Sequence, residues 1–205
     1  MSDRQQHWDK VYRDKDHTRV SWFQEDCATI VEEIIKLPLP KAGRILDVGG
    51  GASRLVDNLL AAGFSDLHVL DIAAGGLAIS QHRLGELAAK VDWICGDITT
   101  AKLPTAIALW HDRAAFHFLT APDDRRAYVE QMRRSLAPGG FVMLAAFAIN
   151  GPEKCSDLKI EQYSSDKLLS QLGEDFVMLA SDQRLHITPA GGQQLFQHGV
   201  FRFKG

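Results

Sequence analysis

Residues 45–53, ILDVGGGAS, decide the fold, because a short apolar run leads directly into three consecutive glycines. The apolar run predicts a buried strand, and residues 53–62 predict a helix that ends at Gly63. Glycines between a strand and a helix let the backbone approach a ligand closely at the carboxyl end of a parallel sheet. We therefore expect a ligand site at this turn. A tight turn without a ligand is the alternative.

The same alternation of short apolar runs and helical stretches continues along the chain. Further strands are expected at residues 67–70, 91–95, 106–110 and 141–147, with helices at residues 77–89 and 122–136. Strands that alternate with helices predict a parallel sheet covered on both faces. A last helix at residues 164–172 precedes strands at residues 176–180, or to 187, and 194–203. These two strands predict an antiparallel hairpin, so the fold class is α/β with a mostly parallel seven-stranded sheet.

Two amphipathic helices are expected before this pattern begins. Residues 3–14 place Trp8 and Tyr12 on one face, and residues 24–37 follow with a second apolar stripe. We expect a single domain over residues 1–205, with an N-terminal helical segment at residues 1–40, a βα core at residues 43–147, and a substrate-side loop, helix and hairpin at residues 148–205.

Composition and charge exclude several classes of protein. The net charge of -3 over 205 residues gives no bulk electrostatic attraction for nucleic acid or for an acidic membrane surface. The longest apolar run, residues 141–149, is too short to cross a bilayer, and the charged start lacks a secretory signal. Three widely separated cysteines are typical of reduced thiols, and they predict neither a disulfide framework nor a metal site. We expect a cytoplasmic protein.

An acidic residue stands at the end of each of the first three strands, as Asp47, Asp71 and Asp97. Asp71 could accept hydrogen bonds from both hydroxyls of a ribose. Asp97 could accept one from an adenine amino group while Ile98 packs on the ring. The alternative for each is a helix cap or a carboxylate in a turn. Because no phosphate-neutralising base accompanies them, the three sites favour an adenosyl ligand without phosphates.

The fourth strand leads into a second candidate set, His111, Asp112 and His117. A histidine there could deprotonate an attacking thiol, amine or hydroxyl. The alternatives are a structural ion pair between Asp112 and Arg113 and a packed His117. No run such as N-P-P-Y follows this strand, so an amino group of a nucleic-acid base is not the expected acceptor.

A nicotinamide-dependent reductase on a similar fold is the alternative from a different class. Arg54 stands where the dinucleotide fingerprint places its third glycine, and a side chain of that size would crowd the pyrophosphate. The chain also lacks a Tyr-x-x-x-Lys pair. Both features weaken the nicotinamide interpretation.

The segments DVGGGAS, VLDI, CGDI and LAPGGFVMLAAF resemble the successive motifs of the class I (seven-strand, Rossmann-like) S-adenosylmethionine-dependent methyltransferases. The resemblance covers residues 43–147 and implies a Rossmann-like three-layer sandwich that binds S-adenosylmethionine. It implies that the backbone at Gly49, Gly50 and Gly51 passes the methionine part of the cofactor. The side chains that it implies around the cofactor are Asp47, Asp71, Ile72, Asp97, Ile98 and His111.

The N-terminal segments HWDKVY and RVSWF resemble those of protein-lysine and of thiol or thiopurine methyltransferases, whose first segment folds over the cofactor as a lid. The resemblance implies that Trp8, Tyr12 and Trp22 lie near the sulfonium, where aromatic rings exclude water and favour a positive charge. The alternative is that these aromatics only anchor a terminal helix. The acceptor stays open between a small thiol or carboxylate and a lysine amine. A catalytically silent adenosyl-binding partner protein is a further alternative, and no oligomeric state is predicted.

Overall fold

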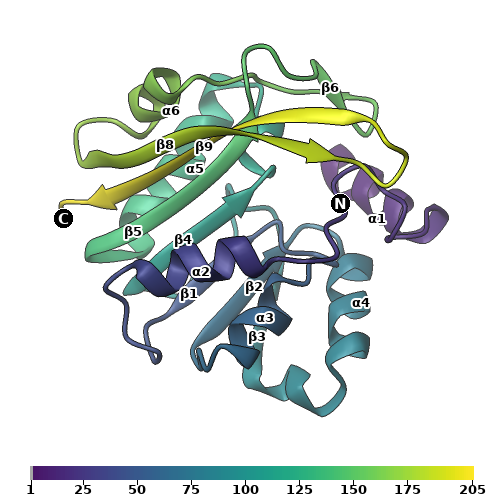
Figure 1. Cartoon of the computed structure of the whole chain (residues 1–205), viewed down its shortest axis with the longest axis horizontal. Coiled ribbons are helices and arrows are strands. Elements are labelled where there is room, and N and C mark those ends of the chain that lie inside the picture. The colour runs from purple at the N-terminus through teal and green to yellow at the C-terminus, as the bar shows by residue number, and fades with distance from the viewer. Residues whose placement is uncertain (1) are drawn as a thin grey trace.

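The computed structural model describes residues 2–205, and they form a seven-stranded sheet with helices on both faces (Figure 1). The strand order is β3-β2-β1-β4-β5-β9-β8, in which β1 to β5 run parallel and β8 and β9 form an antiparallel hairpin. The sheet strands are β1 (Ile45–Val48), β2 (Leu67–Asp71), β3 (Val91–Cys95), β4 (Ile107–Arg113), β5 (Leu136–Phe147), β8 (Phe176–Ile187) and β9 (Gln193–Phe203). The predicted α/β fold class is confirmed.

The helices lie close to the predicted positions, with shifted ends. They are α1 (Asp3–Asp14), α2 (Ala28–Lys36), α3 (Leu55–Ala61), α4 (Ala74–Leu84), η1 (Gly85–Lys90), η2 (Phe116–Phe118), α5 (Pro122–Ser135) and α6 (Ser165–Leu172). The stretch at residues 77–89 therefore divides into α4 and the 3-10 helix η1, because Gly85 takes a φ of +57° and ends α4. A small separate hairpin, β6 (Lys154–Cys155) and β7 (Leu158–Lys159), was not predicted.

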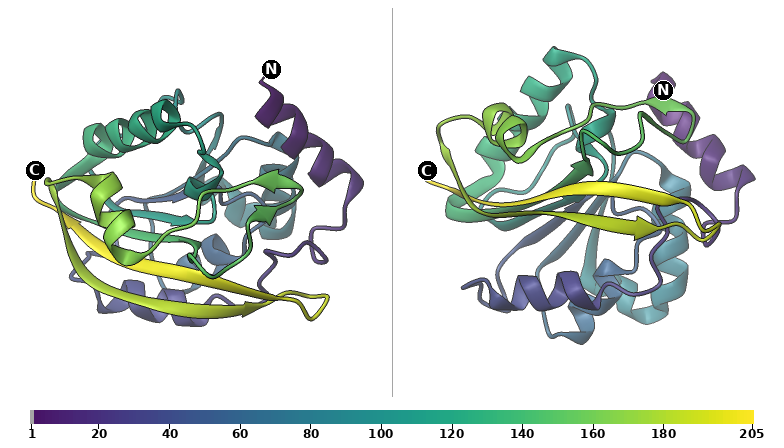
Figure 2. Two further views of the ribbon diagram at one scale, coloured as in Figure 1. Left: turned by 90° about the horizontal axis from the view of Figure 1, so that it is seen from above. Right: turned by 45° about the horizontal axis from the view of Figure 1, so that its top comes forward.

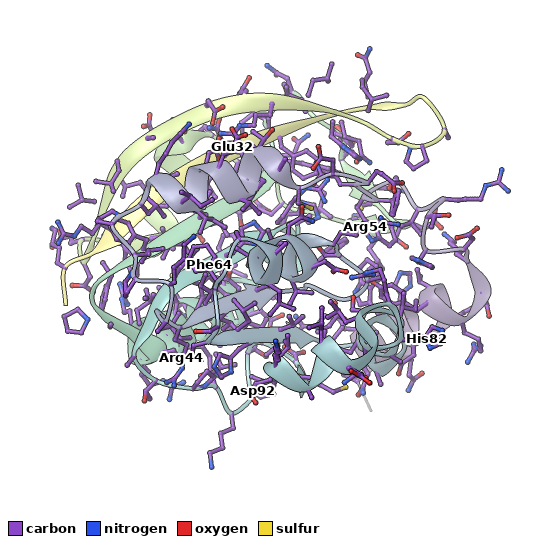
Figure 3. All side chains as sticks on the ribbon, turned by 60° about the horizontal axis from the view of Figure 1, so that its bottom comes forward. Glu32, Arg44, Arg54, Phe64, His82 and Asp92 are labelled. Carbon is purple, nitrogen blue, oxygen red and sulfur yellow. The ribbon has the colours of Figure 1, made fainter. Side chains whose placement is uncertain are left out.

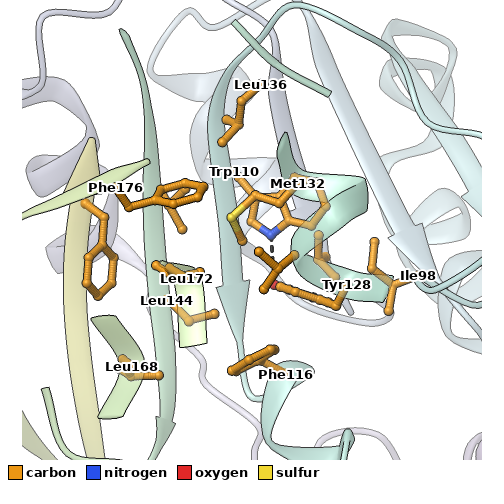
Figure 4. Packing of buried hydrophobic residues seen from close by; sticks show 14 of the residues in the cluster. Ile98, Trp110, Phe116, Tyr128, Met132, Leu136, Leu144, Leu168, Leu172 and Phe176 are labelled. Carbon is orange, nitrogen blue, oxygen red and sulfur yellow. Dashed lines mark hydrogen bonds between the residues drawn. The ribbon is translucent and has the colours of Figure 1, made fainter. Parts of the chain in front are cut away.

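Each face of the sheet has its own apolar core. Figure 2 shows α2 and α5 on opposite sides of the sheet. Ile34 and Leu59 belong to the cluster on the side of α2, α3 and α4. On the other side, Trp110 packs against Met132 and Tyr128 of α5, and the Trp110 Nε1 donates to Tyr128 Oη over 2.8 Å (Figure 4). Because helices cover both faces of the sheet, most side chains of β1 and β4 are buried, and both strands are nearly continuous apolar runs in the sequence.

The strand order reverses between β1 and β4, which are hydrogen-bonded neighbours. The crossovers from β1 through α3 and α4 cover one face, whereas the crossover through α5 covers the other. The loops therefore diverge at the carboxyl ends of β1 and β4 and leave a crevice between them. Ligands of doubly wound folds bind at such a switch point.

Candidate functional site

The main pocket opens at this switch point. It is lined by the carboxyl ends of β1 to β4, by α1 and by the loop that carries Trp22. Eight residues expected from the sequence line it: Trp8, Tyr12, Trp22, Gly49, Asp71, Ile72, Asp97 and Ile98. A second pocket adjoins it and includes Asp47, Gly50 and His111. Both pockets share Gly49, so the glycine turn forms the boundary between them.

The glycine turn has no room for side chains. Gly49 and Gly51 have φ values of +71° and +35°, in the region that favours glycine. A Cβ on Gly51 would overlap Tyr12 Oη and would lie 2.7 Å from Asp71 Oδ2, and a Cβ on Gly50 would lie 2.6 Å from Val69 Cγ1. The three glycines are therefore required by the packing of this site, and Gly51 leaves its backbone next to the Asp71 carboxylate.

Asp71 is buried at the end of β2. Its Oδ1 accepts a hydrogen bond from the backbone N–H of Ala73 over 2.8 Å. Burial, with a smaller contribution from the nearby Asp47 charge, raises the pKa of Asp71 to about 7. Asp71 is therefore partly protonated at neutral pH, and a ligand that donates hydrogen bonds to it would stabilise the carboxylate.

Asp97 lies in the turn after β3, and its two carboxylate oxygens contact different residues. Its Oδ1 accepts from the backbone N–H of Thr99 over 2.9 Å and from Thr99 Oγ1 over 2.8 Å. Its Oδ2 lies 3.4 Å from the Arg4 guanidinium, which also lies 3.3 Å from Asp124. Asp97 therefore caps its turn and ties α1 across the mouth of the main pocket.

The aromatic residues of α1 close the pocket from above. Trp8 packs edge-on against Trp22 and Phe118, with ring centroids 5.5 Å and 5.0 Å away. The Tyr12 ring fills the space beside Gly51 and Gly76. Figure 1 shows α1 beside β6, and His7 Nε2 lies 3.3 Å from Ser156 Oγ in the β6–β7 turn. The N-terminal helix thus has the position of a lid over the main pocket.

His111 and Asp47 form a buried pair at the floor of the second pocket. His111 Nδ1 lies 2.7 Å from Asp47 Oδ1, and the two residues are opposite each other on β4 and β1. Donation from Nδ1 to the carboxylate leaves Nε2 as the proton acceptor of the ring. Of the three candidate bases, His111 alone lines either of the two pockets.

Asp112 does not line either pocket, in contrast to the sequence prediction. Side chains alternate along a strand, so Asp112 points to the α5 face whereas His111 and Arg113 point to the other. Its Oδ2 accepts from Tyr128 Oη over 2.6 Å, and its Oδ1 accepts from the backbone N–H of Ala115 over 2.8 Å. Burial raises the pKa of Asp112 to about 6. Asp112 thus holds β4, α5 and η2 together, and it forms no ion pair with Arg113 in the described chain.

His117 does not face the main pocket or the second pocket either. It is fully buried between the rings of Phe118 and Phe147, and its Nδ1 accepts from the backbone N–H of Phe147 over 3.3 Å. Burial lowers the pKa of His117 to about 3, so the ring stays neutral at physiological pH. The geometry fits the alternative of a packed histidine.

Several lining residues were not predicted as site residues. Arg4, Arg113, Phe118 and Leu119 all line the main pocket, as does Cys155. Arg113 follows His111 at the same-face spacing of a strand, and that spacing is the signal that could have identified it. Cys155 is buried, which raises the pKa of its thiol to about 11.

Among residues 2–205, no cluster of His, Cys, Asp or Glu could hold a metal ion. In the same part of the chain, no helix is both long enough and apolar enough to cross a membrane.

The sequence of this chain is similar to those of several known proteins. Residues 45–140 match the family model described as "Methyltransferase domain". Human EEF1A lysine methyltransferase 2 is 24% identical over 195 residues, which cover 85% of this chain and 74% of that protein. The ubiquinone/menaquinone biosynthesis C-methyltransferase UbiE of Methylobacterium nodulans is 32% identical over 108 residues, which cover 51% of this chain and 42% of that protein.

Solved structures share the fold at low identity. The N-methyltransferase NodS of Bradyrhizobium japonicum, in complex with S-adenosylhomocysteine, superposes with a TM-score of 0.74 at 15% identity, covering 99% of this chain and 100% of that one. A structure from work on the conversion of a disulfide bond into a thioacetal group during echinomycin biosynthesis superposes with a TM-score of 0.78 at 18% identity, covering 98% of this chain and 93% of that one.

Proposed function

We propose that this chain acts as a class I S-adenosylmethionine-dependent methyltransferase and that its main pocket holds the cofactor beneath α1; the matched methyltransferase domain and the shared fold support this. The observation that carries the proposal is the convergence of the glycine turn, Asp71 and Asp97 from three successive strand ends on one covered pocket. When bound, the cofactor supplies a methyl group on a positively charged sulfur to a nucleophile.

The adenosine half of the cofactor fits the part of the pocket between β2 and β3. Ile72 and Ile98 give apolar walls for the adenine ring, and Asp97 lies beside them with an acceptor oxygen. Asp71 accepts hydrogen bonds from the ribose hydroxyls in its ionised form. Charge-assisted bonds of this kind are stronger than neutral ones, so they offset the burial that raises the pKa of Asp71.

We assign the amino-acid half of the cofactor to the path along the glycine turn, where Gly49 and Gly50 line the pockets and Gly51 lies behind Tyr12 and Asp71. This path leads from the main pocket toward Asp47 in the second pocket. Trp8, Tyr12 and Trp22 cover the same path, so they keep water away from the sulfur and favour its positive charge.

The chain itself has two tasks in the reaction. It aligns the acceptor with the methyl group, and it removes a proton where the acceptor carries one. His111 is the residue we assign to the second task, because it lines a pocket and Asp47 orients its ring. Asp112 and His117 have no such position.

We propose that the acceptor is a small molecule that binds in the main pocket on the side of Arg113 and Cys155. The relatives include a protein named as a lysine methyltransferase and a protein named for quinone biosynthesis, so a lysine amine is the alternative. We also propose that the protein works in a reducing compartment such as the cytoplasm, and its three free cysteines support this. We do not expect a nucleic-acid acceptor, because the net charge of -3 gives no general attraction for nucleic acid.

Methyl transfer can be tested directly. Purified protein is incubated with S-adenosylmethionine labelled in the methyl group and with separated small-molecule and protein fractions of a cell extract. We expect label in the small-molecule fraction, formation of S-adenosylhomocysteine, and loss of both with Asp71→Ala. Label found only on protein lysines would replace the proposed acceptor, and no transfer with any fraction would support a silent adenosyl-binding protein.

A further inference from the structure

Arg113 occupies the junction of the two pockets. It ends β4 and lines both the main and the second pocket. Its Nη1 donates to the backbone carbonyl of Trp22 over 2.9 Å, and its guanidinium lies 5.4 Å from the centre of the Phe196 ring. The positive charge is therefore held at a fixed place at the edge of the proposed cofactor site.

The charge of Arg113 lacks a counter-ion in the described chain. No Asp or Glu of residues 2–205 pairs with it, and its Nη2 is buried without a hydrogen-bond partner. Arg83 and Arg184, by contrast, pair with Asp57 and with Glu33 respectively. Burial lowers the pKa of Arg113 to about 10, so the group is still charged at neutral pH. An unpaired buried charge is costly, so a partner is expected to arrive from outside the chain.

The histidines near Arg113 favour the neutral form and so add no further positive charge. Burial lowers the pKa of His117 and of His198 to about 3 and lowers that of His186, and the Arg113 charge lowers all three further. His186 Nε2 donates a hydrogen bond to the backbone carbonyl of Ser21 over 2.8 Å. Its partner is therefore a neutral group and not a carboxylate.

The cysteines and the nearby carboxylate do not neutralise Arg113 either. Burial raises the pKa of both Cys27 and Cys155 to about 11, so the two thiols are protonated at neutral pH. The Asp47 carboxylate is already bonded to His111. No carboxylate of the described chain bonds the guanidinium itself, and its unpaired Nη2 favours a ligand that accepts hydrogen bonds and carries negative charge.

Two contacts of the Arg113 guanidinium come from outside the part of the chain that the methyltransferase family model matches. They are the Trp22 carbonyl and the Phe196 ring, and both residues lie outside residues 45–140. Cys155, on the wall of the same pocket, lies outside that range as well. These neighbours of the guanidinium therefore come from segments that the family model does not match.

We propose that Arg113 binds a carboxylate of the methyl acceptor, so that the acceptor is a small anionic molecule rather than a protein lysine. This inference rests on the proposed function. The carboxylate of the cofactor's own amino-acid half is the second possible source of the anion, and the first arm of the experiment separates the two sources.

The first arm measures binding of S-adenosylhomocysteine and of 5′-methylthioadenosine, which lacks the amino-acid half, by titration calorimetry. The proteins are wild type, Arg113→Gln, Arg113→Lys and the control Arg44→Gln. Arg44 stands before the first residue of β1 and pairs with Asp66, whereas the glycine turn and Arg54 follow the last residue of β1. Figure 3 shows Arg44 and Arg54 well apart, so Arg44→Gln removes an arginine charge away from the pockets. We expect S-adenosylhomocysteine to bind Arg113→Gln within about threefold of wild type. A loss of tenfold or more, with unchanged 5′-methylthioadenosine binding, would assign Arg113 to the cofactor and overturn the acceptor assignment. No binding by wild type would instead overturn the proposed function.

The second arm tests the acceptor with S-adenosylhomocysteine at saturation. Benzoate, phenylacetate and glutarate are each compared with the matching amide. We expect wild type and Arg44→Gln to bind at least one acid tenfold or more tightly than its amide, and Arg113→Lys to keep part of this preference. Arg113→Gln should lose it, because charge-assisted bonds need the cation. A merely structural Arg113 would change acid and amide binding equally. Wild type without any preference, or a preference unchanged in Arg113→Gln, would overturn the inference.

Discussion

The affinity for S-adenosylhomocysteine should rise with pH, and Asp71 should be the cause. In the free protein, burial raises the pKa of Asp71 to about 7. The proposed ribose hydroxyls donate to the ionised carboxylate and lower its pKa in the complex. Binding therefore releases a proton from Asp71, and a reaction that releases a proton becomes more favourable as the pH rises.

The magnitude follows from the ionised fraction of Asp71. With a pKa of about 7, the carboxylate is about one-tenth ionised at pH 6 and about nine-tenths ionised at pH 8. The dissociation constant should therefore fall about tenfold between these two values, which corresponds to about 1.4 kcal/mol. At pH 7, about half a proton should be released for each ligand bound.

Titration calorimetry at pH 6, 7 and 8, with two buffers of different ionisation enthalpy at pH 7, measures both quantities. Asp71→Asn is the matched control, because it keeps the shape but cannot ionise. We expect this variant to bind weakly, with a dissociation constant that does not change over the range. A flat profile in wild type, or an equal slope in Asp71→Asn, would refute the assignment of Asp71 to the ribose.

Three other substitutions separate the roles of turn, core and lid. Gly51→Ala places a methyl group against Tyr12 at a φ of +35°, so it should weaken S-adenosylhomocysteine binding tenfold or more and lower the free energy of unfolding by about 1–3 kcal/mol in urea titrations. Tyr128→Phe removes the donor to Asp112, so it should lower the free energy of unfolding by about 1–3 kcal/mol while the affinity for S-adenosylhomocysteine stays unchanged. Trp8→Ala removes the edge-on contacts with Trp22 and Phe118, each worth about 0.5–1.5 kcal/mol, so the complex should dissociate roughly tenfold faster in stopped-flow fluorescence.

The opposite outcomes would change these three assignments. Wild-type affinity in Gly51→Ala would remove the ligand from the glycine turn. Normal stability of Tyr128→Phe, with weaker ligand binding, would return Asp112 to the site. An unchanged dissociation rate in Trp8→Ala would make α1 an anchor rather than a lid.

The parts of the fold that local signals specify were predictable from the sequence. The apolar run and glycines at residues 45–53 place β1 and its turn, and the repeated alternation gives the parallel sheet. The start of β5 was misjudged, because Pro138 and the two following glycines looked like the end of a helix, whereas the strand begins at Leu136. The added first residues pair with β4, where Leu136 lies opposite Ile107, whereas β9 pairs with Phe141–Phe147. No local pattern contains that information.

The candidate site was predictable only where a residue stands at a strand end. Asp71 and Asp97 do, and they line the pocket as expected. Asp112 was misplaced because three neighbouring residues of β4 were treated as one group, whereas the strand sends alternate side chains to opposite faces. Arg113 gains its meaning from the Trp22 carbonyl, 91 positions away, and from an unpaired Nη2. Such an environment exists only in the folded chain.

Titration of the wild-type protein with S-adenosylhomocysteine, and separately with NADH and NADPH, tests the central claim most directly. We expect one-to-one binding of S-adenosylhomocysteine and no heat from either nicotinamide, because Asp71 and Asp97 line a pocket suited to an adenosyl group and Arg54 stands where the dinucleotide fingerprint places its third glycine. Binding of a nicotinamide cofactor, with none of S-adenosylhomocysteine, would contradict it.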